Sequence, residues 1–559
     1  MAKSTAGDTA ANMPVRTQTL RRGLVIALLA LTLLPSMYMA WISRRMPILG
    51  AFHDASIYWV TGKSIAEGHG YRIASLPEQP WQTKYPPLFP MCLSLIWRIA
   101  PDFPQNLPWA TLFCWMMLPV WIAVTWRVFA DLGLKQSHAL GLCAFLALSQ
   151  TAVLFSLVAM PEVMFSSLWM ASALVAARGG NSTRWAAAAG LIGGAAYLTK
   201  SAAIPLLLAV PLCFVLRRQW RAAMAFATGM LPCIAGWNLW MRTHAMHSTD
   251  VIAVYYTNYL GWHFYNVTLS DLPSLILKNF DRMLWGIGSL ILGIGSTEFQ
   301  MSWFATAIVI WRVLAILTIF GTLRHARRIG WNPFHIFTAG YLLMLWVWHY
   351  PPNERFIFPV LPVLLAGFWT ELCGLGSMLR QSFRLPRAAA TAALAALACV
   401  CLAITGYTFG TVLPQIVSGL RDELNVNREA YGWISRNTPA DAKFLAYQDP
   451  ILYLYTGRTA FRRTVPTRYF YREDRDGVSE LFPALPAFAR DHGLEYLVAT
   501  SRDFHGEFLP GDLLEEARRK SRTSPRLQEV FRVKDTAVYR ILDRPAAPLA
   551  SEQGAPGHM

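Results

Sequence analysis

Long stretches in which almost every residue is apolar or small recur along this sequence, and they restrict the fold more than any other feature. Residues 24–40, 185–216 and 388–408 are apolar on every face of a helix. A helix that crosses the hydrocarbon core of a bilayer needs about 20 such residues, whereas a helix of a soluble protein has one apolar stripe. With 54% hydrophobic and 15% charged residues among 559, the chain is predicted to be an integral membrane protein.

The basic residues predict the orientation of the chain in the membrane. The formal net charge is +17, and much of the excess lies in short segments between apolar runs, as in cytoplasmic loops. A nucleic-acid-binding protein would gather these charges on one folded face, so no nucleic-acid partner is expected. If residues 1–22 are cytoplasmic, every later arginine cluster also falls inside, provided that residues 88–100 lie along the outer surface.

Residues 88–100 are too short to cross the membrane. At about 1.5 Å per residue they cover roughly 20 Å of a core of about 30 Å, and they include Arg98. The outer loop after the seventh span is expected to extend from 242 to about 300. We therefore expect about eleven spans: 23–43, 107–127, 139–156, 161–178, 185–199, 202–217, 221–241, 301–323, 334–349, 356–376 and 388–410.

The tail has a different composition and is predicted to be a small external α/β domain. Residues 443–448, 495–500 and 536–542 alternate or read like strands, and 429–439 is typical of a helix that ends at Thr-Pro. The predicted fold class is mostly α, a polytopic helix bundle with this C-terminal domain. Its parts are a cytoplasmic segment at 1–22, a membrane domain at 23–412, an α/β domain at 415–543 and a disordered end at 544–559.

Charged and polar residues gather on the side predicted to be external. Ionisable groups at membrane depth are costly unless they line a wet cavity or pair with one another, so these residues are predicted to form one site. The eight cysteines lie in or next to apolar segments without the paired spacing of a metal site. The residues of the predicted site include Asp54, Lys84, Glu162, Lys200, His349, Glu354 and Arg355.

Each of these residues also has a purely structural interpretation. Asp54 is suited to accept a proton, but it would equally cap a helix over 55–67. Glu162 follows Pro161 and suits a helix N-terminus. Both interpretations stay open for each of these acids.

The cations are ambiguous in the same way. Lys84 and Lys200 would contact a phosphate or would extend to lipid headgroups. Arg355 can hold a phosphate with two donors of its planar fork, or it pairs with Glu354 for packing alone.

A weak metal motif lies after the seventh predicted span. His244, His247 and Asp250 have the spacing HxxHxxD, but neither a helix nor supporting residues are evident there. A divalent metal is therefore left open.

Several short motifs occur in an order that resembles the family C (GT-C) polytopic glycosyltransferases, specifically the group of protein O-mannosyltransferases and lipid A aminoarabinose transferases. The motifs cover nearly the whole chain. They are "HDASIYW" (53–59), "EGHGYR" (67–72), "KYPPLFP" (84–90), "MPE" (160–162), "YLTKSAAI" (197–204), "ERFIFPVLP" (354–362), "WISRNTP" (433–439) and "LYLYTGR" (452–458).

The resemblance implies transfer of a sugar from a polyprenyl-phosphate carrier, with inversion, to an acceptor on the periplasmic face of a bacterial inner membrane. Asp54 would be the catalytic base or would orient the acceptor, and Glu162 would be a second acidic residue. The residues that would hold the carrier phosphate are Lys84, Lys200 and Arg355. Further candidates for the substrate site are His53, Tyr58, Tyr85, His349 and Glu354.

The acceptor is left open between a protein, lipid A and a surface glycan. Asp54 is followed by Ala55, where aminoarabinose transferases tend to have an acidic pair, and the oligosaccharyltransferase signature WWDYG is absent. The main alternative function is a transporter or flippase of a lipid-linked or anionic substrate, which would place its binding groups near the bilayer midplane. An O-antigen ligase or polymerase, or a membrane anchor for the tail, are further alternatives.

Overall fold

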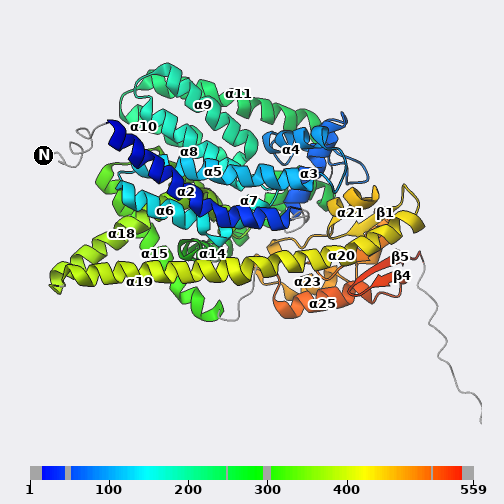
Figure 1. The fold of residues 1–559 in the computed structure, drawn as a ribbon. Helices are drawn as coiled ribbons and strands as arrows, with labels where there is room; N and C mark the ends of the chain where they lie inside the picture. Colours follow the sequence, from blue (N-terminus) through cyan, green and yellow to red (C-terminus); the bar gives the residue numbers. More distant parts are fainter. Residues whose placement is uncertain are drawn as a thin grey trace, which may run out of the picture.

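The computed structural model describes residues 15–44, 52–246, 248, 250–293, 304–384, 386–504 and 508–543. Helices form a bundle, and a small sheet with its own helices packs at one end of it (Figure 1). The segments 1–14 and 544–559, most of the predicted disordered ends, lie outside the described residues.

The helices of the bundle follow the apolar runs of the sequence. In chain order they are α2 (Val15–Ser43), α3 (His53–Ala66), α4 (Leu88–Ile99), α5 (Leu107–Asp131), α6 (Gln136–Leu148), α7 (Gln150–Leu157), α8 (Glu162–Arg178), α9 (Thr183–Thr199), α10 (Leu206–Leu216), α11 (Trp220–His244), α12 (Val251–Thr257), α13 (Tyr259–Asn266), α14 (Leu272–Leu292), α15 (Phe304–Ile329), α16 (Pro333–Trp346), α17 (Glu354–Ile357), α18 (Leu361–Ser382) and α19 (Arg387–Tyr407).

Six described helices are long and apolar enough to cross a membrane, or seven if a bent pair counts as one span. This confirms a helical membrane protein but not the expected total of about eleven spans. Several bundle helices are shorter than 18 residues, among them α10 and α16. The helix α4 has 12 residues. This confirms the prediction that the apolar segment 88–100 forms a helix shorter than a membrane span.

Two sequence-based expectations need correction. The predicted span 139–156 is broken, because α6 and α7 meet at Ser149 with a bend of 55°. The serine ends one helix and its hydroxyl caps the next by accepting from the N–H of Ala152. The predicted outer loop 242–300 contains the 21-residue helix α14, which has about half of its residues buried.

Close helix packing in the bundle depends on glycine at particular crossings. A Cβ atom on Gly190 of α9 would lie 2.1 Å from the carbonyl oxygen of Phe226 in α11. A Cβ atom on Gly229 of α11 would lie 2.4 Å from the carbonyl oxygen of Ala187. Small residues at such crossings let two helix backbones approach, as is common in membrane bundles.

The C-terminal domain has the predicted α/β character. Its five strands have the order β2-β1-β3-β5-β4; β1 pairs with β2 and β3 in parallel, and β5 is antiparallel to both neighbours. The three predicted strands are confirmed as β1, β3 and β5. The strands are β1 (Lys443–Ala446), β2 (Thr459–Phe461), β3 (Tyr496–Ala499), β4 (Leu527–Val533) and β5 (Thr536–Ile541).

A long helical segment joins the bundle to this domain. The helix α19 continues through a π-helical turn at Thr408–Val412 into α20 (Leu413–Asn437), which contacts β4 and β5 of the sheet (Figure 1). The other helices of the domain are α21 (Asp449–Thr456), α22 (Arg468–Arg472), α23 (Arg475–Leu481), α24 (Leu485–Asp491) and α25 (Gly511–Arg522).

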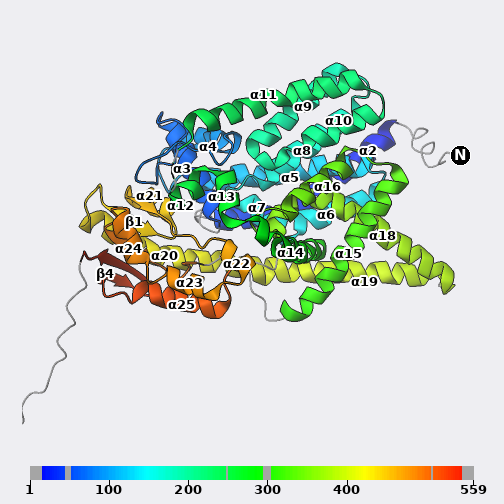
Figure 2. The ribbon, with the colours of Figure 1, turned by 180° about the vertical axis from the view of Figure 1, so that it is seen from behind.

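The domain packs against the bundle at the end that carries α3, α12 and α13 (Figure 2). The N–H of Ala460 in β2 donates to the carbonyl oxygen of Ser75 in the loop after α3, at 2.9 Å. This backbone bond joins the edge of the sheet to the loop that follows the predicted catalytic aspartate.

Candidate active site

Ends of four helices bring the predicted charged residues together. Asp54 lies in the first turn of α3, Glu162 begins α8, Lys200 follows α9 and Arg355 lies in α17. Proline fixes one of these positions, because Pro161 is the N-cap residue of α8 and directs Glu162 into its first turn. The structure brings these four residues together, as predicted.

Arg355 lies at the centre of the cluster. Its Nη2 is 2.5 Å from Oδ2 of Asp54, and its Nε is 2.9 Å from Oε1 of Glu162. The Nζ of Lys200 donates to the same oxygen of Glu162 at 3.0 Å. The carboxyl group of Glu162 is fully buried, and the side chain of Asp54 is the most exposed of the four, at 21%.

These contacts bear on the structural interpretations that the sequence left open. Phe52, and not Asp54, is the N-cap residue of α3, and the carboxylate of Asp54 contacts side chains. Lys200 binds Glu162 instead of extending to lipid. The structure does not have the alternative pairing of Arg355 with Glu354: Arg355 binds Asp54 and Glu162, and Glu354 accepts from the hydroxyl of Ser289 at 3.0 Å.

Lys84 approaches the cluster from the loop after α3. Its Nζ donates to the carbonyl oxygen of Tyr255 at 2.7 Å, so it does not extend away toward lipid. The same nitrogen lies 4.2 Å from the ring centre of Tyr255, 5.3 Å from that of Tyr85 and 5.8 Å from that of Tyr259. Three aromatic faces thus surround the cation and stabilise its charge.

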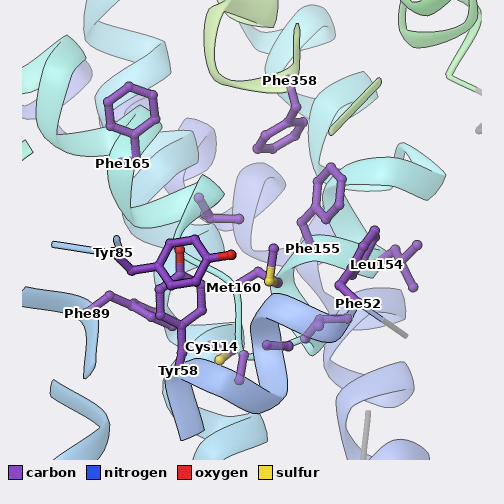
Figure 3. Close-up of a cluster of buried hydrophobic side chains, with 14 of the residues drawn as sticks. Phe52, Tyr58, Tyr85, Phe89, Cys114, Leu154, Phe155, Met160, Phe165 and Phe358 are labelled. Atoms are coloured by element: carbon purple, nitrogen blue, oxygen red, sulfur yellow. The ribbon is translucent and has the colours of Figure 1, made fainter. Parts of the chain in front are cut away.

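Aromatic side chains form the apolar wall beside the charges (Figure 3). The hydroxyl of Tyr85 donates to Oδ1 of Asp54 at 2.6 Å, and its ring packs on Tyr58 at 5.0 Å between centres. Tyr58 also packs edge-on against Phe89. The guanidinium of Arg355 lies 5.2 Å from the ring centre of Phe52. Such a wall limits water and strengthens the electrostatic interactions next to it.

The surroundings set the charge states of two groups. Burial alone would raise the pKa of the Asp54 carboxyl, but Arg355 and Lys84, with the hydroxyl of Tyr85, hold that pKa well below its usual range. Burial lowers the pKa of Lys84 to about 8, against the opposing effect of Asp54. Asp54 is therefore ionised at neutral pH, and Lys84 is close to its titration point.

The remaining predicted residues lie at the edge of this cluster. The Nε2 of His53 lies 2.7 Å from Oδ1 of Asp449 in the C-terminal domain. His349 is buried beside His263, and its carbonyl oxygen accepts from the hydroxyl of Thr467 at 2.7 Å. Among the described residues, neither histidine side chain forms a hydrogen bond with Asp54, Glu162 or Arg355.

Sequence reasoning missed two residues that the structure brings to the site. Asp449 follows a predicted strand in the tail, in a stretch without any chemical motif. Tyr255 belongs to a stretch rich in tyrosine and tryptophan at 255–265. No sequence signal links Tyr255 to Lys84 or Asp449 to His53, because each contact joins segments that are far apart in the chain.

The donor set at the site does not match a metal centre. Across the described parts of the chain, no group of three or more His, Cys, Asp or Glu side chains converges. Asp250 of the weak motif accepts from His492 and caps α12, His244 stacks on Trp240, and His247 lies outside the described residues. The two carboxylates of the cluster are held by Arg355 and Lys200.

A large cavity lies beside the cluster and not within it. Its volume is about 860 Å³, and its lining combines apolar and charged residues of α14 and α15 with residues of the C-terminal domain. Arg282 lines it and packs against the rings of Trp285 and Phe470. The next turn of α14 contacts the segment that carries Arg355, since a Cβ on Gly286 would meet Asn353 and Glu354.

Comparisons with known proteins were made by sequence and by structure. No family model matches the chain, and no curated protein matches it by sequence. The crystal structure of the oligosaccharyltransferase from Archaeoglobus fulgidus in complex with Zn and sulfate is 12% identical, with a TM-score of 0.52 over 92% of this chain and 72% of that chain.

The same enzyme, tethered with an acceptor peptide that contains the NVT sequon, is 11% identical, with a TM-score of 0.51 over 92% of this chain and 74% of that chain. ArnT from Cupriavidus metallidurans bound to undecaprenyl phosphate is 13% identical, with a TM-score of 0.49 over 94% of this chain and 99% of that chain. The likeness to the oligosaccharyltransferase shows that the two chains share a fold.

Proposed function

We propose that this protein is a membrane glycosyltransferase that moves one sugar from a polyprenyl-phosphate carrier to an acceptor. The observation that carries the proposal is the bridge that Arg355 makes between Asp54 and Glu162, next to Lys84 and Lys200. Three cations and two acids meet at one place, and an anionic leaving group and an acceptor hydroxyl need this combination.

The cations suit the phosphate of the carrier. A guanidinium has five N–H donors, and Arg355 uses its Nε and one Nη2 donor to hold the two acids. The remaining donors match the oxygens of a phosphate, which Arg binds in a planar, two-donor arrangement. Lys84 adds a second positive charge that acts on Asp54.

The reaction is a single displacement at the anomeric carbon. The acceptor oxygen forms the new bond to this carbon while the bond from carbon to the phosphate oxygen breaks. The electron pair leaves with the polyprenyl phosphate, whose growing negative charge Arg355 and Lys84 stabilise. The proton of the acceptor hydroxyl passes to Asp54, and attack from the face opposite to the leaving group inverts the configuration.

Asp54 is better suited to orient the acceptor than to remove its proton early. A carboxyl group whose pKa lies well below the usual range is a weak base. It accepts a hydrogen bond from the hydroxyl in the ground state and takes the proton late, when attack has made that oxygen acidic. Glu162 is fully buried and acts on Arg355 and Lys200, which it holds in place.

The fold supports this chemistry. The oligosaccharyltransferase from Archaeoglobus fulgidus shares it over 92% of this chain, and one of its structures carries a tethered acceptor peptide. Transfer of a sugar at a membrane is thus compatible with this arrangement of helices and C-terminal domain. The acceptor hydroxyl belongs to a protein, to lipid A or to a surface glycan.

We place the site on the periplasmic face of a bacterial inner membrane. Asp131 and Arg178 form an ion pair at the opposite end of the helices from Asp54 and Glu162, and arginines accumulate at that opposite end, as expected of a cytoplasmic side. The bent pair α6 and α7 and the shorter helices α8, α9, α10 and α16 would complete the eleven expected crossings. The C-terminal domain is then periplasmic as well.

A transporter or flippase has less support. Its binding groups would lie near the bilayer midplane on interrupted helices, whereas Asp54, Glu162 and Arg355 lie in the first turns of α3, α8 and α17. These acids and cations also pair with one another at a single end of the bundle.

The direct test incubates the purified protein in lipid with a panel of radiolabelled polyprenyl-phosphate sugars and with a membrane extract as the source of acceptors. We expect release of free polyprenyl phosphate from one donor, with the label moved to a new product. An Asp54→Asn variant should lose this release by a factor of about 10² to 10⁴. Turnover of no donor in the panel would reject the proposal.

A further inference from the structure

A buried acid of the C-terminal domain contacts α3, the helix that carries Asp54. Asp449 begins α21, and its side chain is fully buried. Its Oδ1 accepts from the Nε2–H of His53 at 2.7 Å and from the hydroxyl of Tyr256 at 2.8 Å. The hydroxyl of Ser75 lies 3.5 Å from Oδ2. One carboxylate thus joins the domain to the residue that directly precedes Asp54.

The contact fixes the tautomer of His53. Because Nε2 faces a carboxylate, this nitrogen carries the proton, and the neutral ring then has an acceptor at Nδ1. Burial lowers the pKa of His53, and Arg462 lowers it further, so the ring is neutral at physiological pH. The hydroxyl of Tyr255 lies 3.3 Å from Nδ1 and donates to it.

Tyr255 in turn holds Lys84. Its carbonyl oxygen accepts from Nζ at 2.7 Å, and its ring lies 4.2 Å from the same atom. A continuous path of contacts therefore leads from Asp449 through His53 and Tyr255 to the cation beside Asp54. Each link joins a different segment of the chain, so none of them is imposed by local sequence.

We propose that Asp449 is a positioning residue of the active site: through His53 and Tyr255, the C-terminal domain sets the place of Lys84. The domain is then a component of the catalytic centre and not an appendage of the membrane bundle. That Lys84 binds a carrier phosphate rests on the proposed function, whereas the positioning of Lys84 by Asp449 does not.

The path distinguishes the two roles that a buried acid can have. If the acid only stabilises the domain, its removal lowers the stability of the fold and changes no particular residue of the bundle. If the acid positions Lys84, its removal changes the water exposure and the pKa of the Lys84 amine. The groups that face His53 and Lys84 are Asp54, Arg355, Asp449, Arg462, Tyr85, Tyr255, Tyr256 and Tyr259.

Asp449 offers two informative substitutions. Asp449→Ala removes the acceptor of both hydrogen bonds. Asp449→Asn keeps an oxygen at the position of Oδ1 for His53 and Tyr256, and places its amide toward Ser75. The alanine variant should release Lys84, and the asparagine variant should behave like the parent protein, because geometry and not charge carries the effect.

Asp503 provides the matched control. It is also a buried acid of the C-terminal domain, and its carboxylate accepts from the N–H and hydroxyl of Thr500 within that domain. Asp503→Asn perturbs the same domain without touching the path to Lys84. A thermal melt of each variant measures how much folded protein remains.

The experiment measures the labelling of Lys84 with an amine reagent across pH, by peptide mass spectrometry, on the full chain in detergent. In the parent protein we expect a midpoint near 8, and in Asp449→Ala a shift toward the ordinary lysine value of 10.5. Asp503→Asn should keep the parent midpoint. An unchanged midpoint in Asp449→Ala, or an equal shift in Asp503→Asn, would overturn the inference.

A binding assay with polyprenyl phosphate extends the test to function. If the proposed function holds, Asp449→Ala should weaken binding by about tenfold or more, as expected when a charged donor is misplaced. If polyprenyl phosphate binds neither the parent nor the variant, the proposed function fails, and the labelling of Lys84 still decides the role of Asp449.

Discussion

Arg355 Nη2 lies 2.5 Å from Oδ2 of Asp54, although 301 positions separate the two residues in the sequence. Through its Nε the same guanidinium binds Glu162, so one cation neutralises two acids that come from different helices. Buried ion pairs of this kind tolerate the loss of one partner poorly, because the remaining charge is left without compensation. Several measurable consequences depend on this bridge.

Removal of Arg355 alone should affect both stability and activity. Arg355→Gln leaves Asp54 and Glu162 without their shared cation, and we expect a loss of about 3–5 kcal/mol in the free energy of unfolding. Arg355→Lys retains a charge and should lose less. Thermal melts in detergent measure the effect. A charge-balanced Asp54→Asn, Arg355→Gln variant should recover much of the stability but none of the activity, and stability equal to that of Arg355→Gln would argue against the bridge.

The affinity for the carrier phosphate should depend on pH through Lys84. Its pKa is lowered to about 8, so the amine is charged below this pH and neutral above it. Binding of polyprenyl phosphate should therefore weaken as pH rises from about 7 to 9. Lys84→Arg keeps its charge over the whole range, and we expect its affinity to stay level there. Parallel pH profiles for the two proteins would exclude Lys84 as the titrating group.

The hydroxyl of Tyr85 should matter more than that of Tyr58. Tyr85 donates to Asp54 at 2.6 Å and helps to hold its carboxylate ionised, whereas Tyr58 contributes its ring by packing on Tyr85. Tyr85→Phe should reduce turnover by about tenfold, a typical cost for one hydrogen bond to a charged group. Tyr58→Phe should reduce it less. Initial rates at saturating donor compare the two, and a reversed order would contradict this assignment.

The proposed orientation makes a prediction about chemical access. His69, in the loop after α3, should lie outside, and Asn181, between α8 and α9, should lie inside. Each is exposed and can be replaced by cysteine in a chain whose native cysteines are changed to serine. A membrane-impermeant thiol reagent added to intact cells should label position 69 and leave position 181 unlabelled until the cells are opened. The opposite pattern would place the site in the cytoplasm.

Much of the fold could be predicted because the bilayer leaves few choices. Apolar length predicted long helices such as α5 and α11, and strand alternation predicted β1 and β3. The helix α14 was missed because Lys278, Asp281 and Arg282 interrupt its apolar run. Its charged residues line the large cavity, and two of them, Lys278 and Asp281, form ion pairs there. A hydropathy argument alone treats such an amphipathic helix as a loop.

The sequence predicted which residues form the site but not which of them contact one another. The predicted topology put Asp54, Glu162 and Arg355 at one face of the membrane, and the structure joins all three. The sequence could not predict that Arg355 binds Glu162 in place of the adjacent Glu354. The choice depends on how α8, α14 and α17 pack, since Ser289 of α14 contacts Glu354. The role of Asp449 could not be predicted either, because only the packing of the domain on the bundle brings it to His53.

The most direct test of the central claim compares two ion pairs of the same chemistry at opposite ends of the bundle. Asp54 pairs with Arg355 in the proposed site, and Asp131 pairs with Arg178 at the far end of α8. The measurement is the release of free polyprenyl phosphate in one turnover by Asp54→Asn and Asp131→Asn, each corrected for folded protein. We predict that Asp54→Asn loses a factor of about 10² or more and that Asp131→Asn retains the parent rate. Equal rates in the two variants would contradict the claim that the Arg355 cluster is the active site.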